Sequence, residues 1–136
     1  MEGNAIIAMT DQELIEGFEN GTLSNECFHH REHVRVAFLY VSQYAALEAL
    51  QRFSKALRRF AALHGKPQLY HETITWAYVL LIQERVARAE KKQSWDEFAR
   101  HNPDLLQWKD GILTRYYHAE TLQSELARAV FVFPDR

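Results

Sequence analysis

The sequence predicts an all-α protein that folds as a single-domain bundle of about five to seven helices with an extended C-terminal strap. Apolar residues recur along most of the chain at the three- and four-residue spacing of amphipathic helices. Only five Gly and three Pro interrupt the 136 residues, which is too few for a turn-rich β-sandwich. A chain of this length is typically built around one hydrophobic core. We therefore assign residues 1–136 to one domain.

Local start and stop signals delimit the helices in the first three quarters of the chain. Thr10 with Glu13, and Ser94 with Glu97, have the capping-box pattern that opens a helix. Gly65 is placed to end one. Together with the apolar spacing, these signals predict five helices: residues 11–20, about 28–44, 47–63, about 70–91, and from 95 to the break at 102–104.

The last quarter of the chain is predicted to be less regular. Two short helices are expected near residues 112–117 and 120–128. The tail over residues 130–134 reads Val-Phe-Val-Phe-Pro. Apolar residues of this kind, in which β-branched and aromatic side chains alternate, favour extended backbone. We therefore expect the tail to lie as a strap across the body of the protein.

Composition and charge exclude several functional classes. A net charge of −2 and a pI near 6.4 argue against nucleic-acid binding. Residues 1–4 lack the basic start of a secretory signal peptide, and no apolar stretch reaches the ~20 residues that span a bilayer. The lone cysteine, Cys27, cannot form an internal disulfide and fits a reducing compartment. We expect a cytoplasmic protein with no membrane or nucleic-acid partner.

Three of the seven histidines fall together in Phe28-His29-His30-Arg31-Glu32-His33. With about 100° of rotation per residue, His33 lies at about 60° and His30 at about 120° from Val36. Both directions lie within the apolar side of the predicted helix. Because a buried imidazole without a partner costs about 1–3 kcal/mol, inward histidines need partners. One interpretation is a shared site; the other is that each ring caps a loop or bonds a backbone carbonyl.

The helix over residues 70–91 begins with Tyr70-His71-Glu72-Thr73. His71 and Glu72 lie about 50° to either side of its apolar stripe, so both can point inward at the first turn. If this helix packs beside that of residues 28–44 with the N-terminal ends together, His30, His33, His71 and Glu72 form one cluster at the floor of a pocket. Glu72 has a simpler role too, since acids near helix N-termini are stabilising.

Imidazoles and a carboxylate converging from two helices are the ligands that Zn, Fe, Mn or Ni prefer. The sequence therefore predicts a divalent transition metal held by His30, His33, His71 and Glu72. A metal-dependent enzyme acting on a small molecule would then use a metal-bound water as its reactive species. Four further side chains are candidate additional members of the site: His29, Tyr40, Tyr70 and His118.

Two alternatives use the same residues without a metal. In the first, His33 is a catalytic general base oriented by Glu72, and Tyr40 or Tyr70 donates a hydrogen bond to the substrate. In the second, the protein is a non-catalytic helical module that binds a small ligand or forms a homodimer, and its histidines are structural. The sequence lacks a phosphate-binding glycine loop and a Gly-x-Ser-x-Gly motif.

The two histidine stretches resemble the Phe-x-His-x-x-His and Tyr-His-Glu-Thr motifs of a family of small bacterial all-helical proteins. That pattern selects His30 and His33 over His29, and the similarity extends to the end of the chain at residues 131–135. The family has no established activity, so the resemblance implies positions and no reaction. The chain is also loosely similar to DinB-like metal-binding four-helix bundles. It lacks their late His-x-x-x-His pair, so this similarity implies the fold alone.

Overall fold

The computed structural model describes residues 9–136 and confirms the all-α class. Residues 1–4, on which the prediction of no signal peptide rests, lie outside the described residues. The described part contains no strand, and none of its helices is long and apolar enough to cross a membrane. Its α-helices are α2 (Asp11–Asn20), α3 (His30–Gln43), α4 (Ala46–Leu63), α5 (Glu72–Arg88), α6 (Trp95–His101), α7 (Ala119–Gln123) and α8 (Glu125–Ala129).

Both predicted capping boxes are present. At the start of α2, the Thr10 hydroxyl accepts from the Glu13 amide at 3.1 Å, and the Glu13 carboxylate accepts from the Thr10 amide at 2.9 Å. Ser94 and Glu97 repeat this arrangement at the start of α6. Gly21 ends α2 with a φ of 72°, in the left-handed region that favours glycine. Local signals of this kind explain why the predicted helix ends lie close to the observed ones.

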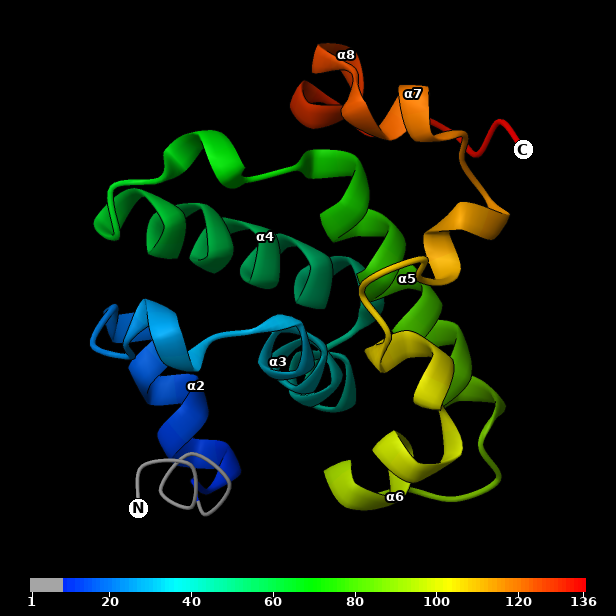
Figure 1. The fold of residues 1–136 in the computed structure, drawn as a ribbon. Helices are drawn as coiled ribbons and strands as arrows, with labels where there is room; N and C mark the ends of the chain where they lie inside the picture. Colours follow the sequence, from blue (N-terminus) through cyan, green and yellow to red (C-terminus); the bar gives the residue numbers. More distant parts are fainter. Residues whose placement is uncertain (1–8) are drawn as a thin grey trace.

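Helix α3 lies at the centre of the molecule, seen end-on in Figure 1, and packs against α2, α4, α5 and α6. Five of its fourteen residues are buried: Val34, Val36, Ala37, Phe38 and Tyr40. Because neighbours cover α3 on several sides, few directions around it lead to solvent. His30 and His33, which point toward the apolar side of α3, therefore lie among packed side chains.

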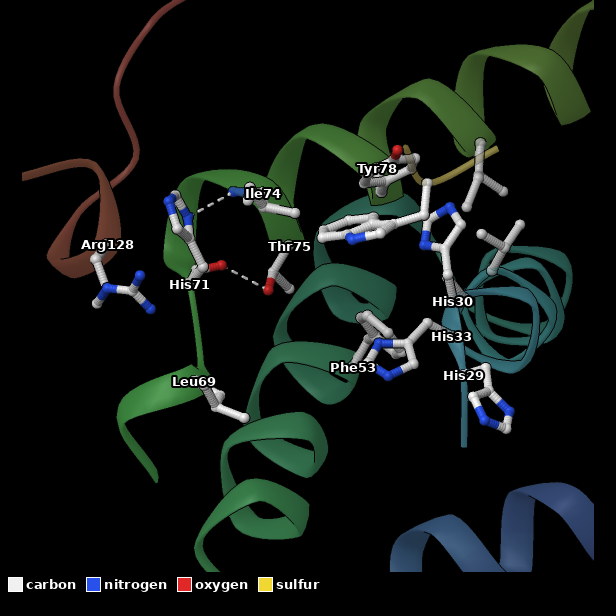
Figure 2. A pocket seen from close by; sticks show the side chains of 14 residues that line it. His29, His30, His33, Phe53, Leu69, His71, Ile74, Thr75, Tyr78 and Arg128 are labelled. Carbon is white, nitrogen blue, oxygen red and sulfur yellow. Dashed lines mark hydrogen bonds between the residues drawn. The ribbon is translucent and has the colours of Figure 1, made fainter. Parts of the chain in front are cut away.

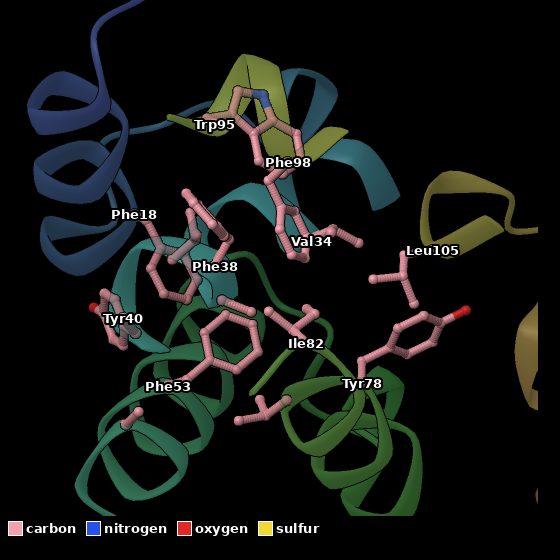
Figure 3. Packing of buried hydrophobic residues seen from close by; sticks show 14 of the residues in the cluster. Phe18, Val34, Phe38, Tyr40, Phe53, Tyr78, Ile82, Trp95, Phe98 and Leu105 are labelled. Carbon is pink, nitrogen blue, oxygen red and sulfur yellow. The ribbon is translucent and has the colours of Figure 1, made fainter. Parts of the chain in front are cut away.

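Aromatic residues fill the core on two sides of α3 (Figure 3). On one side, the ring of Phe18 stacks on that of Phe28 at 4.9 Å and lies 5.9 Å from that of Phe53. On the other side, Phe38 of α3 packs against Phe98 of α6 at 4.6 Å between ring centroids. These contacts join α2 to α4 and to the segment that leads into α3, and they join α6 to α3 itself.

The C-terminal quarter differs in detail from the prediction. The segment expected to be helical near residues 112–117 is a 3₁₀ turn, η4 (Ile112–Arg115). The helix expected over 120–128 is divided into α7 and α8, because Ser124 has an extended conformation between them. Its hydroxyl accepts from the Ala127 amide at 3.1 Å and caps α8. The serine side chain thus competes with continuation of the helix.

The predicted C-terminal strap is confirmed. Residues 130–134 are not helical, and they run past the first turns of α5. The buried Thr73 hydroxyl donates to the Val130 carbonyl at 2.8 Å and accepts from the Val132 amide at 3.1 Å. The Phe131 ring stacks on Trp76 of α5 at 5.1 Å. Two backbone bonds and one aromatic contact therefore hold the strap against α5.

Candidate functional site

A pocket of about 600 Å³ lies among α3, α4, α5 and the turn that carries Trp108. Figure 2 shows His29, His30 and His33 at one end of this pocket, and His71 and Arg128 at the other. Its lining is apolar and aromatic apart from the histidines, one threonine and one arginine: His29, His30, His33, Val34, Ala37, Phe53, Leu69, His71, Ile74, Thr75, Tyr78, Ile82, Trp108 and Arg128. This volume is typical of small-molecule sites.

His30 is held at the first turn of α3 by a bond to backbone. Its Nε2 lies 2.8 Å from the carbonyl oxygen of Leu105, in the 3₁₀ turn η3 (Pro103–Leu106). Because a carbonyl only accepts, Nε2 must carry the proton and Nδ1 keeps its lone pair. The ring also lies 4.9 Å from that of Tyr78 and 5.0 Å from that of Trp108. His30 therefore bonds a backbone carbonyl, as expected if the inward histidines have a structural role.

His33, one turn further along α3, stacks on the Phe28 ring at 4.2 Å between ring centroids. Burial, with smaller contributions from the nearby His30 and His29 rings, lowers the pKa of His33 to about 4. Burial also lowers the pKa of His30 and that of His71. At neutral pH these imidazoles are therefore uncharged, and the pocket presents neutral rings to whatever it contains.

His71 serves as the N-cap of α5 and uses both ring nitrogens. Its Nδ1 accepts from the Ile74 amide at 3.1 Å. Its Nε2 donates to the carbonyl oxygen of Leu122, on α7, at 2.6 Å. The side chain therefore fastens α7 to the start of α5. Metal coordination by His71 would break one of these two bonds.

Glu72 is directed away from the pocket, although the sequence places it beside the apolar stripe of α5. Its carboxylate accepts from the Tyr70 hydroxyl at 2.6 Å and lies 3.2 Å from Nη2 of Arg58. Glu72 is not among the residues that line the pocket. Its charge is balanced by Arg58, on α4, so the carboxylate neutralises a cation instead of meeting His33.

The four additional candidates lie in different places. His29 lines the pocket mouth and is largely exposed, with its backbone amide bonded to Glu32 at 2.8 Å. The Tyr40 hydroxyl is bonded to Glu19, and Tyr70 lines a separate small pocket. His118 is exposed, and its amide donates to Asp135 at 3.0 Å. Of these four, the structure brings only His29 to the pocket.

The predicted four-residue cluster does not form because α3 and α5 meet in a different register. His30 contacts Tyr78, which lies seven residues after His71. Seven residues correspond to about 10 Å along a helix, so the start of α3 lies against the middle of α5. The first turn of α5 is covered by α7 and the strap instead. His30 and His33 therefore share a pocket with His71 but not a cluster.

Within residues 9–136, no three His, Cys, Asp or Glu side chains are grouped so that they could hold a metal ion. The hydrogen bonds explain this finding for the predicted ligands. His71 is bonded through both nitrogens, His30 through one, and Glu72 to Arg58 and Tyr70. The lone pair on Nδ1 of His30 and the ring of His33 remain facing the pocket.

Sequence reasoning missed two residues that shape the pocket, Trp108 and Arg128. Trp108 is 60% exposed and lies on a tight turn that ends in Gly111. A Cβ at Gly111 would lie 2.5 Å from the Gln107 carbonyl oxygen, so this close approach requires glycine. The adjacent Asp110 has a positive φ of 51°. The Asp-Gly pair is thus the sequence signal for this turn, although nothing local indicates that the turn faces α3.

Comparison with known proteins finds no matching family model, no matching curated protein and no matching solved structure. The resemblance of the two histidine motifs to a bacterial family therefore stays a prediction.

Proposed function

We propose that this protein binds a small, largely apolar molecule in the pocket among α3, α4 and α5. The observation that carries the proposal is the lining: a pocket of about 600 Å³ whose apolar and aromatic side chains surround imidazoles that are uncharged at neutral pH. An apolar ligand entering it would meet one arginine, Arg128, at one end, and it would gain from removal of apolar surface from water.

The histidines have specific parts in this proposal. Nδ1 of His30 can accept a hydrogen bond from the ligand, because the Leu105 carbonyl fixes the proton on Nε2. The indole of Trp108, packed 5.0 Å from His30, supplies a flat apolar wall. His71 acts on the fold, since its two bonds connect α5 to α7. The protein is then a binding module, which is the non-catalytic alternative inferred from the sequence.

Calorimetric titration with 1-octanol tests the proposal. Burial of an eight-carbon chain at about 0.8 kcal/mol per CH₂ is favourable by about 6 kcal/mol, which exceeds the smallest association cost of about 4 kcal/mol, so weak binding should be measurable at millimolar octanol. Ile74→Trp puts a larger side chain into the pocket and should weaken binding at least tenfold. Leu80→Trp is the matched control, because Leu80 lies on the same helix, is 41% exposed and does not line the pocket.

Two outcomes would overturn the proposal. The first is the absence of octanol binding, or equal binding by Ile74→Trp and wild type. The second is a stoichiometric transition metal in protein purified without added metal, lost in His33→Ala, which would favour the metal-dependent enzyme. Trp108→Ala provides a further check if Ile74→Trp does not fold. This variant removes one wall, and weaker octanol binding is expected.

A further inference from the structure

Arg128 is the one cation among the residues that line the pocket. It extends from α8, and its Nη1 donates to the carbonyl oxygens of Gln68 at 2.8 Å and Tyr70 at 3.4 Å. Gln68 and Tyr70 belong to the connection between α4 and α5. The two hydrogen bonds therefore hold the guanidinium between that connection and α8. Figure 2 shows it at the end of the pocket away from His30 and His33.

The charge of Arg128 is not balanced by an acidic side chain. Within residues 9–136, no carboxylate lies within 4 Å of its guanidinium, and its Nε and Nη2 make no hydrogen bond. Arg58, which lines a smaller adjoining pocket with Arg128, provides a contrast: it is paired with Glu72 at 3.2 Å and stacks on Tyr70. One arginine is therefore neutralised, while its neighbour keeps two free donors.

A positioned guanidinium with free donors is suited to a carboxylate, which can accept two parallel N–H bonds. The remainder of the lining carries no carboxylate and no Lys or second Arg, and the lowered pKa values of His30, His33 and His71 keep these imidazoles neutral at pH 7. The complementary ligand thus has one negative charge at one end and an apolar body.

We propose that the ligand is a monocarboxylic acid with an apolar chain or ring, bound with its carboxylate on Arg128 and its apolar part toward Trp108. This inference rests on the proposed function and names its ligand class. Burial of the apolar part would supply most of the affinity, while the ion pair would select acids over neutral molecules of the same size.

Parallel calorimetric titrations with octanoate and 1-octanol at pH 7.5 and low salt test this inference. Wild type should bind octanoate about three- to fivefold more tightly, because Arg128 is exposed and an exposed ion pair is worth at most about 1 kcal/mol. Arg128→Gln should bring the ratio of octanoate affinity to octanol affinity close to one, whatever its effect on octanol binding itself. Arg128→Lys, which keeps the charge, should retain part of the preference. Arg59→Gln is the matched control, because it removes an exposed arginine that does not line the pocket.

The outcomes separate the two proposals. If wild type binds both compounds equally, or Arg128→Gln keeps the full preference for octanoate, the carboxylate inference is refuted while the apolar pocket stands. If wild type binds neither compound, both proposals are refuted. If Arg128→Gln loses octanol binding as well, the comparison of Arg128→Lys with Arg59→Gln decides. A preference for octanoate that is smaller in Arg128→Lys than in Arg59→Gln supports the inference, and equal preferences refute it.

Discussion

The buried imidazole of His33 should make the stability of the protein depend on pH in a way that one substitution can isolate. Burial lowers its pKa from 6.5 to about 4. Between these values the unfolded chain binds a proton at this site that the folded chain does not. The free energy of unfolding therefore falls as the pH drops below about 6.5, and the loss levels off below about pH 4.

The magnitude follows from the two pKa values. Each unit of difference corresponds to about 1.4 kcal/mol, so the full effect is about 3 kcal/mol. About 2 kcal/mol of it is lost between pH 7 and pH 5. For a domain of this size, that loss lowers the melting temperature by about 7 °C. The pKa values of His30 and His71 are also lowered, so they add to the same trend with the same sign.

Thermal or urea unfolding from pH 8 to pH 4.5 measures this effect, with wild type compared to His33→Gln. The variant should be less stable at pH 8, because it loses the stacking on Phe28, but its stability should fall by about 2 kcal/mol less between pH 7 and pH 5. His101→Gln is the control, because that side chain is exposed on α6 and is not among the groups that shift the pKa of His33. If His33→Gln gives the same pH profile as His101→Gln and wild type, the buried neutral imidazole is refuted.

The remaining predictions concern the contacts that hold the C-terminal half in place. Thr73→Val should lower the free energy of unfolding in urea by about 1–3 kcal/mol, because it leaves the Val130 carbonyl and the Val132 amide without their partner. Thr114→Val is its control. It removes an exposed hydroxyl bonded locally to Gly111 and should change this free energy by at most about 0.5 kcal/mol. Arg85→Ala should lower the free energy of unfolding at pH 7 by about 1–2 kcal/mol, because Arg85 pairs with Asp104 at 2.8 Å and bonds Asn102. Arg88→Ala is its control. It breaks an exposed ion pair on the same helix and should lower this free energy by at most about 0.5 kcal/mol. Equal losses in either pair of variants would contradict these assignments.

The helix boundaries were predictable because the signals that set them are local. Thr10, Ser94 and Gly21 each bond to backbone within three residues, so their patterns specify the same structure in most contexts. The division at Ser124 was missed for a related reason. A serine inside an apolar periodic segment is compatible with a continuous helix as well as with a new cap. The choice between them depends on contacts of the following residues with α5, which lie far away in sequence.

The directions of the histidines were also predictable, because helical rotation alone places His30 and His33 on the apolar side of α3. Their partners were not. The carbonyl that bonds His30 is 75 residues away, and the one that bonds His71 is 51 residues away. Every residue carries the same carbonyl group, so no side-chain pattern marks these acceptors. An inward histidine therefore predicts a polar contact or a pocket wall. Metal binding also requires a ring nitrogen that is not already bonded to a backbone carbonyl. Whether such a carbonyl lies within reach depends on how the helices pack.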